Sequence, residues 1–267
     1  MRIGADDVVI VTGASEGIGR ALSLELAERG VRLVLAARNQ GRLDELAELC
    51  EARGASCLAV ATDVGSEPDC RALVDRTIER WGRIDVLVNN AGLTGWARVD
   101  ELADSRVFEE LLRVNYLGAA WLTRHALPSL LRSQGRIVAI ASVAGLTGVP
   151  ERAAYAASKH AMIGFFESLR IELADRGVTV TIIAPDFVRS EIHRRALGAD
   201  GQPLGSSPMQ ERRIMTAEDC ARRIVTAIDR RERLVVTSMR GRFGRWFKLI
   251  HPALVDRIAA SAIRNRY

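Results

Sequence analysis

The chain begins with a short apolar run that leads through a glycine-rich turn into an amphipathic helix. Residues 8–11 are all valine or isoleucine, and the turn that follows carries Gly13, Gly17 and Gly19. Three residues and then one residue separate these glycines, which differs from the common GxGxxG spacing. A strand, a glycine turn and a helix in this order place backbone N–H groups at a helix N-terminus, where they bind phosphate. The pattern therefore predicts a dinucleotide-binding unit.

Strand-like and helix-like segments alternate along the rest of the chain. Apolar runs typical of buried parallel strands lie at residues 31–36, 56–61, 84–88, 136–141, 178–184 and 234–237. Helical periodicity marks residues 42–53, 67–81, 104–133 and 152–175. This alternation predicts an α/β fold with a Rossmann-type, doubly wound parallel sheet and helices on both faces. We expect a single domain over residues 1–238 and an extension over residues 239–267.

Residues typical of ligand-binding sites follow the predicted strands at their carboxyl ends. In chain order they are Gly13, Arg38, Asp63, Asn90, Ser142 and Pro185. Ligands of open parallel sheets bind at that edge. The agreement among six strands predicts one site there.

Composition is that of an ordinary soluble protein, with 48% hydrophobic and 27% charged residues. The chain lacks an apolar run of about 18 residues, and its first residues carry Asp6 and Asp7 instead of a signal peptide. We therefore expect a cytoplasmic protein. The four cysteines show no metal-ligand spacing, which predicts reduced thiols and no metal site.

The net charge of +5 belongs to the C-terminal end. Residues 240–267 hold seven Arg and Lys and one acid, a net of +6, whereas residues 1–239 hold 31 basic and 32 acidic residues, a net of −1. The body is thus neutral, and the basic segment contains no recognised nucleic-acid module. We expect no nucleic-acid partner.

Tyr155 and Lys159 lie four residues apart in a predicted helix, so their side chains fall on one face. A fixed ammonium stabilises the phenolate form of a neighbouring tyrosine. Such a tyrosine exchanges a proton with a carbonyl oxygen or an alcohol. From these two residues alone, a chance pairing on a surface helix remains the alternative.

Together these motifs resemble the short-chain dehydrogenase/reductase family over about residues 8–237. The resemblance rests on the turn at residues 12–19, the Asn-Asn-Ala-Gly run at residues 89–92, Asn115, Ser142, and Tyr155 with Lys159. Ser142 lies thirteen residues before Tyr155, the interval usual in that family.

The resemblance implies four catalytic residues. Tyr155 would act as general acid in ketone reduction and as general base in alcohol oxidation. Lys159 would hold the nicotinamide ribose and stabilise the phenolate, and Ser142 would hydrogen-bond the substrate oxygen. Asn115 would hold a water that joins Lys159 to solvent. The structural alternatives are that Ser142 caps a strand end and that Asn115 satisfies a helix kink.

The resemblance also implies a nicotinamide cofactor along the same edge. The expected contacts are Gly13, Ser15, Glu16, Gly17, Ile18, Gly19, Arg38, Asp63, Val64, Asn90, Ala91, Gly92, Tyr155, Lys159, Pro185, Val188 and Ser190. Within this set, Asp63 would accept a hydrogen bond from the adenine amino group.

Cofactor choice depends on the end of the second strand, where Ala37 and Arg38 stand in place of an acid. A guanidinium suits a 2′-phosphate, so NADP(H) is favoured over NAD(H); a solvated strand-end charge is the alternative reading of Arg38. Glu16 argues against NADP(H), because relatives that use NADP often carry a basic residue at this position, just before the second glycine of the motif. Its carboxylate would repel the phosphate unless Arg38 or Arg42 compensates.

Residues 185–190 depart from the family pattern, which usually has glycine after the proline and threonine four residues later. Asp186 takes the place of the glycine, and Ser190 keeps a hydroxyl for the nicotinamide carboxamide. The substitution suggests that the backbone does not need a positive φ here.

The candidates for substrate recognition are the loops at residues 93–96, 145–150 and 187–215. The last is rich in Gly and Pro, which predicts a mobile lid. Its apolar residues predict either a lipophilic pocket or a seal onto the domain: Phe187, Ile192, Leu197, Met209, Ile214 and Met215. We expect His193 at the surface and not in catalysis.

The extension repeats an apolar residue every fourth position, among Arg and Lys, at Trp246, Ile250, Leu254 and Ile258. It predicts a basic amphipathic helix interrupted near Pro252. Such a helix binds an anionic membrane surface or packs on its own or a partner subunit, and packing is favoured.

These features favour an NADP(H)-dependent reductase of a lipophilic ketone that also oxidises the secondary alcohol. One alternative is a 3-oxoacyl thioester reductase that acts on acyl-carrier-protein or CoA substrates, and another is an NADP-binding regulator without catalysis. The intact catalytic set argues against the regulator. Family relatives are commonly dimers or tetramers joined through the helices bearing Asn115 and Tyr155, which implies a homodimer or homotetramer.

Overall fold

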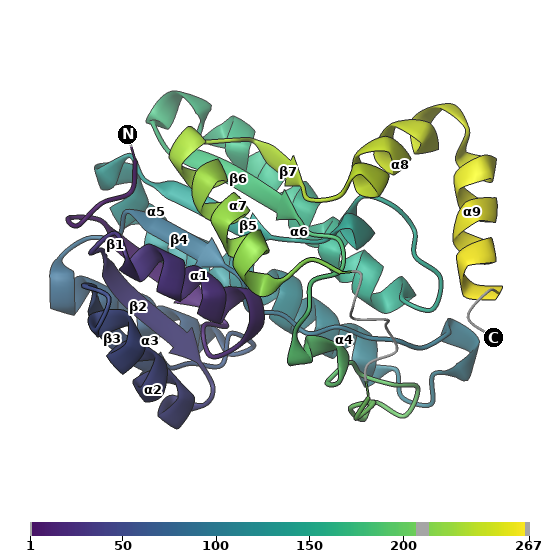
Figure 1. Cartoon of the computed structure of the whole chain (residues 1–267), viewed down its shortest axis with the longest axis horizontal. Coiled ribbons are helices and arrows are strands. Elements are labelled where there is room, and N and C mark those ends of the chain that lie inside the picture. The colour runs from purple at the N-terminus through teal and green to yellow at the C-terminus, as the bar shows by residue number, and fades with distance from the viewer. Residues whose placement is uncertain (1, 207–213, 265–267) are drawn as a thin grey trace.

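A parallel sheet of seven strands forms the centre of the molecule (Figure 1). The computed structural model describes residues 2–206 and 214–264, apart from the side chains of residues 262–264. The strands are β1 (Val8–Thr12), β2 (Arg32–Ala37), β3 (Ser56–Ala61), β4 (Val86–Asn89), β5 (Arg136–Ile140), β6 (Thr179–Ala184) and β7 (Leu234–Val236). Their order in the sheet is β3-β2-β1-β4-β5-β6-β7. The order reverses between β1 and β4, which is where such sheets open a ligand crevice.

Helices cover both faces of the sheet. The helices α1 (Gly17–Ala27), α2 (Gln40–Glu51) and α7 (Ala217–Arg230) contribute to the core on one face, and α3 (Glu67–Trp81), α5 (Gly118–Ser133) and α6 (Ala153–Glu172) contribute to the core on the other. Shorter or later elements are η1 (Val99–Glu101), α4 (Arg106–Leu112), η2 (Arg113–Leu117), η3 (Val143–Gly145), η4 (Ala174–Arg176), η5 (Glu191–His193), α8 (Met239–Ile250) and α9 (Pro252–Arg264).

The central strands are buried on both sides, so their sequences are largely apolar. Successive side chains nevertheless point to opposite faces. Val9 and Val11 join the core beneath α1 and α7, whereas Val8 and Ile10 join the core beneath α5 and α6. Two separate apolar layers therefore hold the strand ends in fixed positions relative to the helices.

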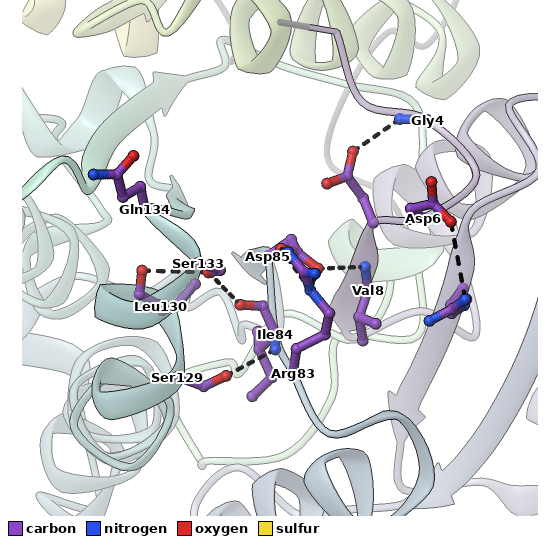
Figure 2. A network of polar contacts seen from close by, with 12 residues as sticks. Gly4, Asp6, Val8, Arg83, Ile84, Asp85, Ser129, Leu130, Ser133 and Gln134 are labelled. Carbon is purple, nitrogen blue, oxygen red and sulfur yellow. Dashed lines mark hydrogen bonds and ion pairs between the residues drawn. The ribbon is translucent and has the colours of Figure 1, made fainter.

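The edge of the sheet opposite the site is fastened by polar contacts (Figure 2). The buried Asp85 carboxylate accepts a hydrogen bond from the Val8 amide at 2.9 Å and is paired with the Arg83 guanidinium at 2.6 Å. The Ser129 hydroxyl accepts from the Ile84 amide at 2.9 Å, and the Ser133 hydroxyl donates to the Ile84 carbonyl at 2.7 Å. These bonds tie the starts of β1 and β4 to α5 and leave the other edge for ligands.

The predicted fold class is confirmed, and each predicted strand lies within two residues of the observed one. The helical region predicted at residues 104–133 is helical from Arg106 to Ser133, and within it the π-helical turn η2 lies between α4 and α5. The helix predicted at residues 152–175 ends at Glu172, and η4 follows it. Sequence analysis did not single out α7, although Thr216 and Asp219 form a helix-capping pair at its start.

The extension consists of two helices that meet at Pro252, the residue at which the sequence predicted an interruption. Figure 1 shows α8 and α9 in yellow at one end of the fold, beyond β7. Among the described residues, no helix combines the length and the apolar character needed to cross a bilayer.

Candidate active site

The glycine turn after β1 is packed too closely for side chains at two positions. Gly13 has a φ of +63°, and a Cβ there would lie 2.9 Å from the Ala91 Cα. A Cβ on Gly19 would lie 2.1 Å from the Gly13 carbonyl oxygen. This packing brings the N-terminus of α1 directly onto the turn, so the residues between them line a cleft with backbone N–H groups available for phosphate.

Thr12 joins the ends of β1 and β4 beneath this turn. Its hydroxyl accepts hydrogen bonds from the amides of Asn90 and Ala91, each at 3.0 Å, and donates to the Val88 carbonyl at 3.2 Å. The Asn90 side chain donates to the Thr12 carbonyl at 2.8 Å. The motif at residues 12–19 includes Thr12 but predicts no role for it; a hydroxyl at the end of an otherwise apolar strand is the signal that identifies it.

A cleft of about 890 Å³ runs along the carboxyl edge of the sheet. Its lining includes Gly13, Ser15, Glu16, Gly17, Ile18, Arg38, Asp63, Val64, Asn90, Ala91, Gly92, Ser142, Tyr155, Lys159, Pro185, Val188 and Ser190. The structure therefore brings together nearly all of the predicted site residues. Gly19 lies beneath the turn inside α1, and Asn115 is fully buried behind the cleft wall.

Lys159 is buried on α6, with its side chain at the cleft. The Nζ atom donates to the Ile140 carbonyl at 3.0 Å and lies 5.9 Å from the centroid of the Tyr155 ring. Burial lowers the pKa of Lys159; the charge of Tyr155 acts in the opposite direction, and that of Arg152 adds to the lowering. The four-residue spacing thus places a phenol and an amine in one buried corner, as the sequence predicted.

Asn115 occupies the π-helical turn η2, a type of helix defect that is frequent at functional sites. Its Nδ2 atom donates to the Leu93 carbonyl at 2.9 Å and to the Ser158 hydroxyl at 2.8 Å, and its Oδ1 atom accepts from the Leu93 amide at 2.8 Å. The side chain therefore bonds a loop and α6, and these contacts do not satisfy a kink in its own helix.

Gly92 separates Asn115 from Lys159. A Cβ on this glycine would lie 3.0 Å from the Asn115 Oδ1 atom and 3.5 Å from the Lys159 Nζ atom. Both polar groups therefore approach the same small volume, which any side chain at position 92 would occupy.

Ser142 follows β5 and caps the short helix η3, where its hydroxyl oxygen accepts from the Ala144 amide at 3.1 Å. The structural alternative, a capping serine, is thus observed. A hydroxyl that accepts one bond keeps its proton to donate. Because Ser142 also lines the cleft, capping fixes its position without removing its donor.

Asp186, the residue that departs from the family pattern, fastens the cleft to α8. Its carboxylate accepts from the Ser238 hydroxyl at 2.7 Å and from the Arg240 guanidinium at 2.9 Å, and its amide donates to the Thr237 hydroxyl at 3.0 Å. The same Ser238 oxygen accepts from the Gly241 amide and so caps α8. We call this set of contacts the Asp186 latch.

The predicted lid packs on the loop after β4 where the structure describes it. Leu197 exchanges backbone hydrogen bonds with Thr94 and Trp96 and is 7% exposed. The Trp96 ring stacks on Phe187 with centroids 6.5 Å apart. Met209 lies outside the described residues.

The expectation of a surface position for His193 is wrong. This residue is 5% exposed, its Nε2 atom lies 3.1 Å from the Val188 carbonyl, and it lines the cleft. The turn η5 folds the start of the lid back over Val188, which the sequence pattern of a glycine-rich loop does not reveal.

Glu16 is neutralised by two guanidinium groups at the adenosine end of the cleft. Its carboxylate accepts from Arg42 at 3.2 Å and from Arg195 at 2.8 Å. The first pairing is one of the two compensations that the sequence left open, by Arg38 or Arg42, and the second comes from the lid. Arg38 lines the same part of the cleft.

Comparison with known proteins agrees with this geometry. The sequence profile of the family described as short chain dehydrogenase matches residues 7–199. The chain belongs to this family. It is therefore an oxidoreductase of the alcohol–carbonyl pair that binds a nicotinamide cofactor.

Proteins similar in sequence or structure match most of the length of this chain. The 11-beta-hydroxysteroid dehydrogenase A of Sesamum indicum is 37% identical, and the match covers 94% of this chain and 74% of the relative. A short-chain dehydrogenase/reductase from Burkholderia phymatum, solved in complex with NAD, is 27% identical with a TM-score of 0.83, covering 94% and 96% of the two chains. An alcohol dehydrogenase from Thermococcus sibiricus, solved with 5-hydroxy-NADP, is 27% identical with a TM-score of 0.74, covering 86% and 94%.

Proposed function

We propose that this family member is an NADP(H)-dependent reductase of a lipophilic ketone, which also oxidises the corresponding secondary alcohol, and that Tyr155 is its general acid. The observation that carries the proposal is the buried corner where the Lys159 amine lies 5.9 Å from the Tyr155 ring, at a cleft that Ser142 also lines. A phenol beside a fixed amine exchanges protons with a carbonyl oxygen. The nicotinamide supplies the hydride when it is bound.

The glycine turn supports a dinucleotide in this cleft. Side chains are excluded at Gly13 and Gly19, and Ser190 packs against Gly17, where a Cβ would lie 3.1 Å from the Ser190 Cβ. This contact places the glycine turn, which would bind the phosphates, against the loop of Ser190, which would hold the nicotinamide carboxamide. Asp63, Val64 and Asn90 would hold the adenosine part.

Proton supply to Tyr155 would pass through the volume beside Gly92. Asn115 and Lys159 both direct polar atoms to this volume, and a water bonded to both would link Tyr155 to solvent. Asn115 is held there by its bonds to Leu93 and Ser158. In this scheme Lys159 orients the ribose, and Ser142 donates to the substrate oxygen.

The charges around Glu16 support NADP(H) over NAD(H). Arg42 and Arg195 together more than offset the single carboxylate, and Arg38 adds a third guanidinium where the 2′-phosphate would lie. Because Ala37 offers no carboxylate, nothing at that strand end favours the free ribose hydroxyls of NAD.

A lipophilic substrate is supported by the apolar residues beside Tyr155. Leu197, Ala156 and Ala144 form a buried cluster with the Tyr155 ring, and Leu93 and Val149 pack against it. The sesame relative is named for a hydroxysteroid, which points to a polycyclic or long-chain ketone. A cytoplasmic location and a homodimer or homotetramer remain predictions from the sequence.

The test is a panel of polycyclic ketones, long-chain ketones and 3-oxoacyl thioesters, followed by the loss of NADPH or NADH absorbance. We expect turnover of a lipophilic ketone and a kcat/KM for NADPH at least roughly tenfold above that for NADH. A hydrogen bond to a charged group contributes about 1.5–3 kcal/mol, and about 1.4 kcal/mol corresponds to a factor of ten. Turnover of thioesters alone would favour the 3-oxoacyl alternative. No turnover of any substrate would favour the regulator.

A further inference from the structure

The apolar stripe of α8 faces away from the protein. Met239, Phe243, Trp246 and Ile250 recur at helical spacing, and their exposed fractions run from 56% to 70%. On the opposite side of α8, the buried Gly241 packs so closely that a Cβ would lie 2.8 Å from Val236 and 2.9 Å from Val143. The helix thus turns Gly241 to the body and its large apolar residues outward, against the usual arrangement.

The helix α9 also exposes large apolar residues. Leu254 is 46% exposed and Ile258 is 62% exposed, and α9 packs on α8. Figure 1 shows α9 turning away from the far end of α8 at the end of the molecule. The sequence-based expectation that this stripe packs on its own subunit is therefore not what the structure shows. Large exposed apolar residues gathered on two successive helices are typical of an interaction site.

We propose that α8 and α9 form a docking surface for an anionic lipid bilayer. Residues 239–264 hold six Arg and Lys and one acid, Asp256, a net of +5. Arg242 and Arg257 are exposed, and Arg245 is partly exposed with its guanidinium 5.2 Å from the Trp246 ring. Apolar side chains flanked by cations fit the boundary between acyl chains and anionic headgroups.

Charge argues against a second copy as the occupant. A symmetric dimer through this face would set the same surface against itself, and so would bring two patches of net +5 together. A bilayer that contains phosphatidylserine offers the opposite charge over the whole surface instead.

Docking in this way would bring the bilayer close to the substrate side of the cleft. Lys248 donates to the Leu146 carbonyl at 3.3 Å, Gly241 packs on Val143 beside Ser142, and the Asp186 latch holds the start of α8. If the substrate is a lipophilic ketone, which rests on the proposed function, it would enter from the lipid phase. Binding of the bilayer itself does not depend on catalysis.

The experiment is co-sedimentation of the full-length chain with vesicles of phosphatidylcholine, with and without phosphatidylserine. One variant combines Trp246→Ser and Ile250→Ser, and another combines Arg242→Gln and Arg245→Gln. Matched controls are Ile171→Ser, an apolar residue of α6 that is 75% exposed, and Arg71→Gln, an exposed cation of α3. Circular dichroism checks that every variant is folded.

We expect binding to the anionic vesicles, weak binding to phosphatidylcholine alone, and no change in the two controls. Each removed cation should lower the partition coefficient roughly fivefold, and the serine variant should lose binding. Equal binding to both vesicle types, or none to either, would overturn the proposal. Light scattering that shows a dimer lost in the serine variant, without vesicle binding, would assign the surface to a second copy instead.

Discussion

Replacing Asp186 by asparagine tests whether the latch holds α8 on the cleft. The substitution keeps the shape of the side chain but removes the charge that receives the Ser238 hydroxyl and the Arg240 guanidinium. A hydrogen bond to a charged group contributes about 1.5–3 kcal/mol. The Arg240 pair adds about 0.5 kcal/mol, because its side chain is 72% exposed. Asparagine can still accept one bond, so we expect a loss of about 2 kcal/mol.

This loss acts on local opening of α8 more than on global unfolding, because the sheet does not depend on the latch. A change of about 2 kcal/mol raises the open population roughly 30-fold. Hydrogen–deuterium exchange followed by mass spectrometry should therefore show faster exchange in residues 239–250 by that order, with an unchanged Tm.

Two comparisons make the assignment specific. Arg240→Gln should accelerate exchange in α8 only about twofold, since the exposed pair is weak. Asp175→Asn, at an exposed acid of η4, should leave exchange unchanged. If α8 exchanges at the wild-type rate in Asp186→Asn, the latch does not hold the helix and the reasoning fails.

Three further outcomes are expected. Arg38→Asp should abolish the cofactor preference, because it lowers kcat/KM for NADPH by at least roughly tenfold and leaves kcat/KM for NADH unchanged. Coenzyme kinetics measure both values, and an unchanged ratio would remove Arg38 from the phosphate site. Burial lowers the pKa of Lys159, so the folded chain holds this proton less tightly than the unfolded chain, and stability rises with pH between the folded pKa and the higher unfolded pKa. Lys159→Met should therefore abolish turnover but raise the Tm by a few degrees. The rise should be larger at neutral than at alkaline pH, and a Tm below that of the wild type at both pH values would contradict this reasoning. Burial raises the pKa of Cys70 and Cys220 to about 12, so a disulfide reagent should label both only after unfolding, and rapid labelling of the native protein would disagree.

The sheet was predictable because most of its strands are buried on both faces. Runs such as residues 31–36 are continuous apolar segments between helical patterns, and their ends carry the polar residues that meet in the cleft. The reversal of strand order between β1 and β4 is set by packing across the sheet, which no local pattern encodes.

Asn115 and His193 show why parts of the site were not predictable. The π-helical turn that directs Asn115 inward has the same apolar periodicity as the helices on either side, so the sequence reads as one helix. His193 stands in a polar, glycine-rich loop, and its burial depends on the fold of η5 over Val188. Both positions result from tertiary contacts.

The extension was predictable as helices but not in its orientation. The four-residue spacing of Trp246 and Ile250 predicted a helix with an apolar stripe, and Pro252 predicted its interruption. Which face meets the body depends on Gly241 and on the Asp186 latch, whose partners lie more than 50 residues away in the chain. The sequence marks Asp186 only as a departure from the family pattern and does not predict its contacts with Ser238 and Arg240.

The most direct test of the account is Tyr155→Phe, assayed for ketone reduction beside a fluorescence titration with NADPH. The variant lacks only the hydroxyl, so cofactor affinity should stay within about threefold of wild type, while kcat falls roughly 10²- to 10⁴-fold, the contribution of a general acid. A variant that binds NADPH and reduces the ketone at the wild-type rate would contradict the central claim that this phenol donates the proton.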